Sequence, residues 1–271
     1  MKKRIVCLLM ACVMLLMCGC DMISELTDAL KEPDRPQESV AVQAPAAQPV
    51  PSTVEGPGFN SPEEAILAYA RALQKGDVQE ILSTFAIETY VDKYDLTAWI
   101  ENSGAYTISA QQPIPSSDEY TMGLNRIARQ YNITKNLTYM YMTLGKVENF
   151  VSPITFNGEP YDKPSELVDD MVIYNWMDML AKMEIGNVLR FEDLFQDVEQ
   201  VNRALENNKR YLNCQELIPL AVELTIDGEQ YYLCVDVACY DGRWYNCNFF
   251  GTIGIYLGAS ALGGGLYPLE D

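Results

Sequence analysis

Residues 217 to 250 read LIPLAVELTIDGEQYYLCVDVACYDGRWYNCNFF, and this stretch decides the fold. Three runs rich in apolar, β-branched and aromatic residues lie at 217 to 226, 229 to 240 and 243 to 250. The dipeptides Asp227-Gly228 and Asp241-Gly242 separate them. An Asp-Gly pair between two such runs is the strongest short-range hairpin signal, because both residues tolerate the positive φ of a type I′ turn. The stretch therefore predicts an antiparallel β-meander at the C-terminal end of the domain.

Two-residue turns also fix which residues face each other across the strands. The first turn sets Val222 opposite Leu233, and the second sets Cys247 opposite Asp236. Apolar side chains then gather on one face of the sheet, since successive side chains of a strand point to opposite faces. We expect that face to join the hydrophobic core.

The sequence upstream of the meander predicts mainly helices. Ser61-Pro62 followed by two glutamates is typical of a helix start, and apolar residues recur at helical spacing up to Gly76-Asp77. A second short helix is expected through Phe85, and further helices at 118 to 131, 165 to 185 and 192 to 212. A strand is expected at 136 to 148, and a Gly-rich closing segment from Gly251. An apolar stripe is expected to pack in the core, and it consists of Val168, Val172, Trp176, Met179, Leu180 and Met183. The mixture predicts an α+β fold.

Two separated blocks, SPEEAILAYARALQKGDVQEILSTFA (61 to 86) and DGEQYYLCVDVACYDGRWYNC (227 to 247), resemble the nuclear transport factor 2-like, or cystatin-like, superfamily. A Gly-Asp break between two helices and a terminal hairpin with an aromatic residue after its glycine recur in that family. Gly76-Asp77 and Asp241-Gly242-Arg243-Trp244 match them. The resemblance implies a cone-like domain in which a curved antiparallel sheet wraps around helices. The family includes isomerases, dehydratases and non-catalytic binding modules, so the resemblance alone assigns no activity.

The first twenty residues have the pattern of an export signal. Lys2, Lys3 and Arg4 precede an uncharged apolar stretch at 5 to 17, which as a helix would reach only about 20 Å and is too short to span a bilayer. Met17-Cys18-Gly19-Cys20 resembles the bacterial lipobox, whose last cysteine receives a diacylglycerol and becomes the mature N-terminus. The resemblance implies a signal peptide at 1 to 19 and a lipidated Cys20. A cleaved signal with incidental cysteines is the alternative.

A linker is predicted between the lipid and the folded domain. Residues 31 to 58 carry six prolines and no aromatic residue, so they cannot bury enough apolar surface to offset the ordering of their backbone. We therefore expect residues 20 to 58 to be a disordered tether and residues 59 to 271 to form a single domain. The expected location is the extracytoplasmic face of the cell membrane, with the N-terminal lipid as the contact to the membrane.

The charge and composition exclude several classes of function. The chain has 38 acidic and 19 basic residues, a formal net charge of −19, and it would repel a nucleic acid backbone. It contains no histidine, which excludes a Ser-His-Asp triad, an imidazole proton shuttle and every zinc motif that needs histidine. We expect no cofactor and no metal.

Four cysteines of the domain, Cys214, Cys234, Cys239 and Cys247, allow three pairings. The predicted registers favour disulfides between Cys214 and Cys239 and between Cys234 and Cys247, as diagonal neighbours on the two faces of the sheet. Diagonal neighbours are about 7 Å apart, so a bulge or strong twist would be needed. Buried free thiols are the alternative. A four-cysteine zinc site is disfavoured, because the faces separate the cysteines two and two and no CxxC motif occurs.

The family resemblance also suggests a pocket. Enzymes of the family use a pocket Asp, Tyr or Trp for proton transfer, and the candidates here are Asp236, Tyr139, Tyr141 and Trp244. Tyrosines on a strand are usually packing residues with a solvated hydroxyl, and we prefer that interpretation here. The register also turns Asp236 away from the apolar face, so we assign no catalytic residue. The preferred function is a non-catalytic domain that binds a small molecule or an extracellular protein. The alternative is an extracytoplasmic enzyme of the isomerase or dehydratase kind.

Overall fold

The computed structural model describes residues 54–103, 112–145, 154–156, 159–161, 176–196, 198–249, 251–259 and 263–269. The chain divides into two units, Met1–Pro49 and Val50–Asp271, and every described residue belongs to the second. The predicted signal peptide, Cys20, most of the predicted linker, and Val168 and Val172 lie outside the described residues. In the part that is described, no helix has both the length and the apolar character needed to cross a membrane.

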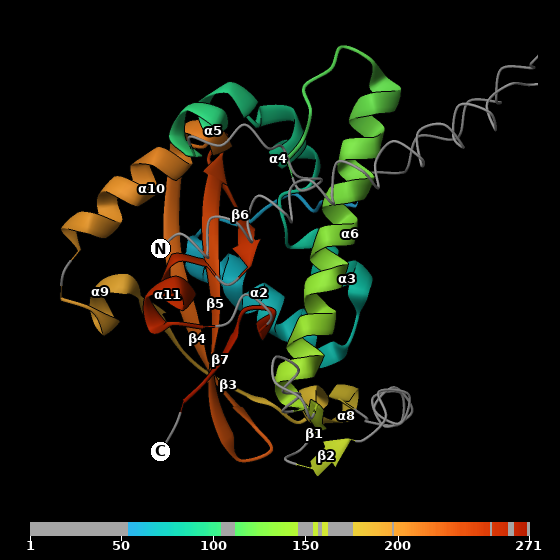
Figure 1. Ribbon diagram of the computed structural model, residues 1–271, viewed down its shortest axis with the longest axis vertical. Coiled ribbons are helices and arrows are strands. Elements are labelled where there is room, and N and C mark those ends of the chain that lie inside the picture. The colour runs from blue at the N-terminus through green and yellow to red at the C-terminus, as the bar shows by residue number, and fades with distance from the viewer. Residues whose placement is uncertain are drawn as a thin grey trace, which may run out of the picture. The chain divides into compact units, whose positions relative to one another are not determined.

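The predicted meander forms the centre of an α+β domain with a curved, five-stranded antiparallel sheet (Figure 1). β4 (Glu216–Ile226), β5 (Glu229–Tyr240) and β6 (Arg243–Phe249) are neighbours, with β3 (Glu184–Arg190) beside β4 and β7 (Leu266–Pro268) beside β5. The turn residues Asp227, Gly228, Asp241 and Gly242 all have φ between 50° and 83°. Val222 faces Leu233 and Leu220 faces Val235, so the predicted first register is confirmed.

β6 departs from the predicted register halfway along the strand. Val237 pairs with Asn246, as a two-residue turn requires, but Asp236 pairs with Asn248 instead of Cys247. One extra residue in β6 makes a β-bulge, which turn geometry alone does not foresee. The prediction that Cys247 lies opposite Asp236 is therefore wrong.

The first helices form as the sequence predicts. In α2 (Pro62–Lys75) the Ser61 hydroxyl accepts a hydrogen bond from the Glu64 amide at 3.1 Å, and Gly76 ends the helix in the left-handed conformation. α3 (Val78–Ser83) follows, capped by Asp77. α2 packs on one face of the sheet, which we call the first face. There the rings of Tyr69, Phe85 and Phe249 meet at centroid distances of 4.5 to 5.9 Å.

A long helix replaces the predicted strand at 136 to 148. α6 (Glu119–Leu144) starts at the cap Asp118, as the predicted helix at 118 to 131 does, but continues for a further 13 residues. Ile133, Leu137, Met140 and Leu144 are buried against the first face of the sheet, at helical spacing. The β-branched and aromatic residues between them suggested a strand, but the buried apolar positions have the period of a helix.

Helices also cover the second face of the sheet, on which Cys234 and Ala238 lie. The predicted helix at 192 to 212 is divided into α9 (Phe191–Leu194) and α10 (Glu199–Leu212), and the Gly-rich segment contributes α11 (Gly251–Leu257). Figure 1 shows α2 and α11 on opposite sides of β5. α4 (Glu88–Lys93) and α5 (Leu96–Ser103) complete this cover. Both faces of the sheet are therefore buried.

The helix predicted at 165 to 185 ends at Ala181 in the structure, because β3 begins at Glu184. α8 (Trp176–Ala181) precedes that strand, and Leu180 and Met183 are buried in the core of the first face, as the apolar stripe predicts. A separate two-stranded sheet is formed by β1 (Ile154–Phe156) and β2 (Glu159–Tyr161).

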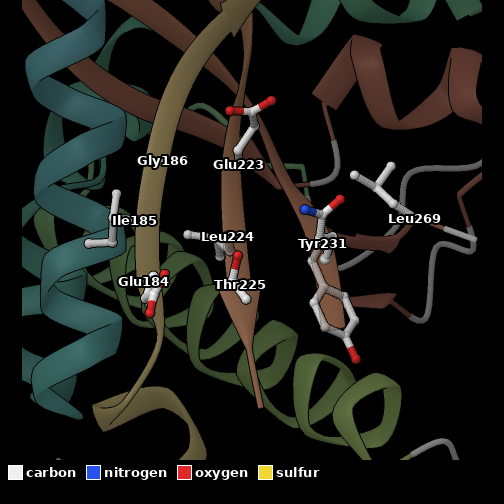
Figure 2. Close-up of a pocket in the computed structure, with 9 residues that line it drawn as sticks. Glu184, Ile185, Gly186, Glu223, Leu224, Thr225, Tyr231 and Leu269 are labelled. Carbon is white, nitrogen blue, oxygen red and sulfur yellow. The ribbon is translucent and has the colours of Figure 1, made fainter. Parts of the chain in front are cut away.

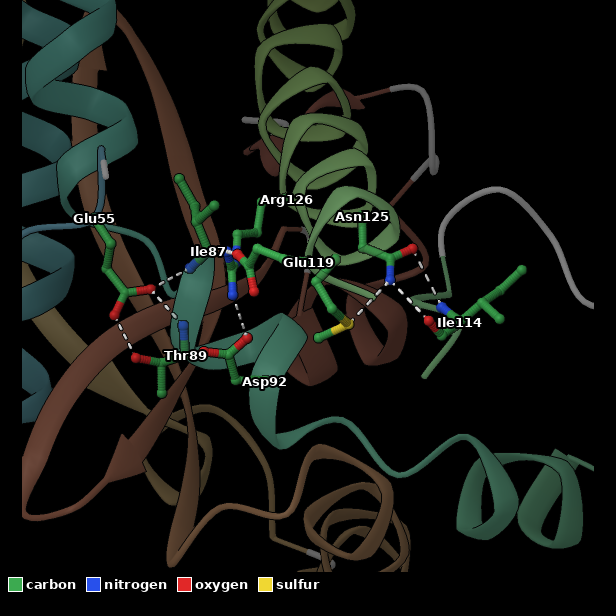
Figure 3. Close-up of polar contacts among 9 residues, drawn as sticks. Glu55, Ile87, Thr89, Asp92, Ile114, Glu119, Asn125 and Arg126 are labelled. Carbon is green, nitrogen blue, oxygen red and sulfur yellow. Dashed lines mark hydrogen bonds and ion pairs between the residues drawn. The ribbon is translucent and has the colours of Figure 1, made fainter. Parts of the chain in front are cut away.

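Polar contacts fasten α6 to its surroundings (Figure 3). Arg126 on α6 forms ion pairs with Asp92 of α4 at 3.0 Å and with Glu119 of its own first turn at 2.6 Å. Asn125 donates to the Ile114 carbonyl and accepts from its amide. These contacts hold α4 and the segment before α6 against the same end of the helix.

The folded domain begins earlier than the sequence indicated. The Glu55 carboxylate accepts hydrogen bonds from the Ile87 and Thr89 amides at 2.6 and 3.0 Å and from the Thr89 hydroxyl (Figure 3). The Glu88 carboxylate in turn accepts from the Val54 and Glu55 amides. The domain boundary predicted between residues 58 and 59 is therefore wrong, because residues 54 to 58 are bound to the domain. Composition alone does not predict the contacts of individual charged side chains such as Glu55.

We expect a chain beginning at Phe59 to be less stable than one beginning at Val50. The shorter chain loses the hydrogen bonds of Glu55 and leaves Glu88 without its backbone donors, a loss of about 1 to 3 kcal/mol in the free energy of unfolding. Denaturant unfolding of both chains measures the difference, and Glu55→Ala in the longer chain should reproduce part of it. Equal stability of the two chains would show that residues 54 to 58 are a passive linker.

Candidate functional site

The structure does not bring the predicted pocket residues together. Tyr139 and Tyr141 lie on α6 and not on a strand, and residues two apart on a helix point about 200° apart. Tyr141 packs against the core of the first face, where burial raises its pKa to about 12. Trp244 packs against that core from β6, and its backbone pairs with Phe59. Tyr141 and Trp244 are therefore packing residues, and none of the three residues lines either of the two pockets described below.

Asp236 is buried on the second face, where it holds α11. Its carboxylate accepts hydrogen bonds from the Thr252 amide at 2.7 Å and from the Thr252 hydroxyl at 3.3 Å, and it also binds the Asn248 side chain. Gly251 makes this approach feasible, because a Cβ there would lie 2.8 Å from the Asp236 amide nitrogen. Burial raises the pKa of Asp236 despite these bonds. The Asp236 carboxylate thus binds the N-terminal end of α11.

The four cysteines are free thiols in the structure. Cys214 and Cys247 lie in one apolar cluster of the second face with Tyr90 and Tyr240, whereas Cys234 lies in another with Phe191. The register that favoured joining Cys234 to Cys247 therefore does not hold. Burial raises the pKa of Cys234 to about 12 and that of Cys247 to about 11, so both thiols stay protonated at neutral pH. Within the described ranges, no cluster of Cys, Asp or Glu has the arrangement of a metal site.

A pocket of about 320 Å³ lies between α4, α5, α6, α10 and the end of β6, and we call it the aromatic pocket. Its lining residues are Tyr90, Tyr94, Trp99, Gln112, Arg129, Asn132, Asn136, Tyr211, Asn248 and Phe249. Figure 1 shows α4 and α6 beside β6. The lining therefore combines aromatic rings, amides and a single guanidinium.

The tyrosines form a continuous wall of this pocket. The ring centroids of Tyr90 and Tyr94 are 5.3 Å apart, and those of Tyr94 and Tyr211 are 5.7 Å apart. Burial raises the pKa of Tyr90 to about 12 and also raises the pKa values of Tyr94 and Tyr211. The three hydroxyls therefore remain neutral near pH 7 and can act as hydrogen-bond donors.

Arg129 of α6 lies across the base of this wall. Its guanidinium carbon is 4.0 Å from the centroid of the Tyr90 ring. Its Nε donates to the Ala86 carbonyl at 3.2 Å, and its Nη2 donates to the Cys247 carbonyl. The bulge in β6 places Cys247 and Asn248 at this position, so the departure from regular strand pairing helps to build the pocket.

A second, smaller pocket of about 200 Å³ lies against β3, β4 and β5, with Leu269 on its other side (Figure 2). Its two carboxylates, Glu184 and Glu223, lie apart in Figure 2. Glu223 accepts hydrogen bonds from the Asn187 backbone and side chain at 3.2 and 2.8 Å. Because the carboxylates are not paired and one is already occupied, the aromatic pocket is the stronger candidate site.

Sequence reasoning missed the aromatic pocket, because its residues come from five elements that are distant in the chain. Asn132 and Asn136 at helical spacing on α6 are the one local signal, and the expected strand concealed it. None of the aromatic residues that line the pocket was among the candidates taken from the family resemblance.

Comparison with known proteins gives one structural neighbour. No known family model matches the chain, and no curated protein matches it. A cystatin-like protein from Ruminococcus gnavus ATCC 29149 is similar in structure, with 16% sequence identity and a TM-score of 0.42. The match covers 79% of this chain and 45% of that protein, so the chain corresponds to less than half of its length. The fold class rests on the described elements themselves.

We expect Asp236→Asn to flatten the dependence of stability on pH. A carboxyl whose pKa is raised in the folded state keeps its proton longer there than in the unfolded chain, so stability falls as the pH rises from the ordinary value of 3.8 through the raised value. The amide variant lacks this titration but keeps an acceptor for the Thr252 amide. Urea unfolding of the variant and the unaltered chain at several pH values measures the pH dependence of their stability.

The matched control is Asp227→Asn, which makes the same change at an exposed turn position where asparagine also accepts positive φ. Identical pH profiles for the Asp236→Asn variant and the unaltered chain would contradict the buried titration.

Proposed function

We propose that this chain is a lipoprotein anchored to the bacterial cell membrane and exposed on its extracytoplasmic face. The support is the order of the N-terminal segments: a positive start, an apolar stretch too short to span a bilayer, and Cys20 after Gly19. The two acyl chains of a diacylglycerol are sufficient for stable anchoring, where a single chain gives marginal binding. A proline-rich tether up to about residue 53 would then hold the domain away from the membrane.

The domain is a non-catalytic ligand-binding module of the nuclear transport factor 2-like, or cystatin-like, kind. The observation that carries this proposal is the composition of the aromatic pocket, whose described lining residues include no carboxylate and no thiol. Carboxylates and thiols are common general bases and nucleophiles. The three tyrosines of the lining have raised pKa values, so they stay protonated near pH 7 and are poor general bases. Rings, amides and a guanidinium bind and orient a ligand without reacting with it.

An enzyme of the isomerase or dehydratase kind is the second candidate. The observation in its favour is Asn248, which lines the aromatic pocket and also binds the buried carboxyl of Asp236. Both Thr252 hydrogen bonds to Asp236 weigh against it, because they direct the carboxylate to α11 and Asp236 is not among the residues that line the pocket. Binding without catalysis is therefore the better supported function.

Lipidation gives the direct test of the anchoring. Metabolic labelling with a fatty-acid analogue should mark the unaltered chain and should not mark Cys20→Ala, because the thiol of Cys20 carries the lipid. Cys18→Ala is the matched control, since it removes a neighbouring thiol and should keep the label. The variant Cys20→Ala should also leave the membrane fraction. Equal labelling of Cys20→Ala and the unaltered chain would refute the anchor.

A further inference from the structure

The aromatic pocket carries a positive charge that its described lining does not neutralise. Arg129 is its only charged lining residue, and no ion pair joins Arg129 to a carboxylate in the described part of the chain. The whole chain has a formal net charge of −19, so this positive pocket contrasts with the net charge of the chain. A half-buried guanidinium that lacks a counter-charge favours an anionic ligand.

Arg129 is also held in position before any ligand arrives. The Ala86 and Cys247 carbonyls and the Tyr90 ring fix the guanidinium on three sides. All three partners are neutral, and a guanidinium has five N–H donors, of which two are used in these backbone bonds. A carboxylate suits the remaining donors, because it can accept two parallel N–H bonds. An ordered cation also reduces the entropy lost on binding.

The other lining groups indicate which class of ligand would carry this carboxylate. The Asn132 side chain has no hydrogen-bond partner among the described residues, and Asn136 donates only to the Asn132 carbonyl at 2.8 Å. Amides both donate and accept, as sugar hydroxyls do. Tyr94 and Trp99 contribute aromatic rings to the lining, and the negative face of an aromatic ring attracts the polarised C–H bonds on one face of a sugar ring. Rings beside free amides therefore suit a saccharide.

Three other classes of ligand fit less well. An aromatic acid would pair with Arg129 but would offer no hydroxyl to the Asn132 side chain. A phosphate carries more negative charge than a single guanidinium neutralises. A neutral sugar would satisfy the amides but leave Arg129 without a counter-charge.

We propose that the aromatic pocket binds an acidic monosaccharide unit, with its carboxylate on Arg129, its hydroxyls on Asn132 and Asn136, and its ring against Tyr94 and Trp99. A volume of about 320 Å³ is at the lower end for ligand pockets and suits one sugar ring. The ligand class rests on the proposed non-catalytic binding function and makes it specific. It also fits a domain that is tethered outside the cell, where acidic glycans occur on surfaces.

Titration of the full chain in detergent with matched sugars tests the ligand class. Glucuronate and glucose differ in one group, a carboxylate in place of a hydroxymethyl, and benzoate is an acid without hydroxyls. Calorimetry should give glucuronate a dissociation constant about tenfold lower than that of glucose, as expected for one added charged pair. Trp99 fluorescence should change with the same midpoint, and this change should be absent in Trp99→Phe. Equal binding of glucuronate and glucose, tighter binding of benzoate, or no binding would overturn the proposal.

Two variants locate the site. Asn132→Asp places a negative charge in the pocket without removing any described hydrogen bond, so it should weaken glucuronate binding about tenfold and change glucose binding much less. Asn202→Asp is the matched control, because Asn202 is exposed on α10 and does not line the pocket. Arg129→Gln should remove the preference for the acid, provided that its thermal unfolding matches the unaltered chain. An equal effect of Asn202→Asp and Asn132→Asp would place the binding elsewhere and overturn the proposal.

The experiment separates this inference from the proposed function. Nuclear magnetic resonance spectra of the sugar after incubation with the protein show whether it has reacted. Unchanged glucuronate supports binding without catalysis. Conversion of the bound sugar would refute the non-catalytic function while the ligand class stands. Absence of binding together with lipid labelling of Cys20 would refute the ligand class and leave the anchoring intact.

Discussion

The two Asp-Gly turns are the constraint on which the rest of the domain depends. Positive φ at Asp227 and Gly228, and again at Asp241 and Gly242, closes two tight hairpins and sets the pairing of β4, β5 and β6 near each turn. A shift of one residue would exchange the side chains of the two faces. Because both faces are covered by helices, such a shift would move Val235 and Val237 out of the first core and bring Asp236 into it. The turns therefore determine which residues each helix meets.

Two buried polar side chains then connect the sheet to its covering helices. Asn246 on the first face donates to the Ala65 carbonyl at 2.9 Å and to the Thr84 carbonyl at 3.1 Å, which joins β6 to α2 and to the end of α3. Asp236 on the second face accepts from Thr252 and joins β5 to α11. Apolar packing tolerates sliding, whereas a buried hydrogen bond is costly to leave unmade. These two contacts thus fix the position of each layer more sharply than hydrophobic burial could alone.

The sequence predicted those parts of the fold that local chemistry controls. Ser61-Pro62 and Gly76 mark α2, and the Asp-Gly turns mark the meander, because caps and tight turns need only neighbouring residues. The alternation around Tyr139 and Tyr141 misled the prediction of a strand, since tertiary burial of Ile133, Leu137 and Met140 decides in favour of a helix. The bulge in β6, the contacts of Glu55 and the aromatic pocket all depend on groups far apart in the chain. No local pattern encodes them.

The aromatic pocket and the carboxylates that support the fold lie in different places, and this separation supports the proposed binding function. In the described part of the chain, two carboxylates away from the pocket support the fold. The half-buried Glu55 accepts hydrogen bonds at the start of α4, and the buried Asp236 accepts hydrogen bonds at the start of α11. The pocket instead collects residues that do not titrate near pH 7, namely buried tyrosines, amides and a guanidinium. The chain has no histidine, the side chain whose ordinary pKa lies nearest to neutral pH, and the buried carboxyl of Asp236 does not line the pocket. A lining with a fixed charge and neutral donors is suited to recognising a ligand whose charge is also fixed. A carboxylate is such a ligand at any pH well above its ordinary pKa.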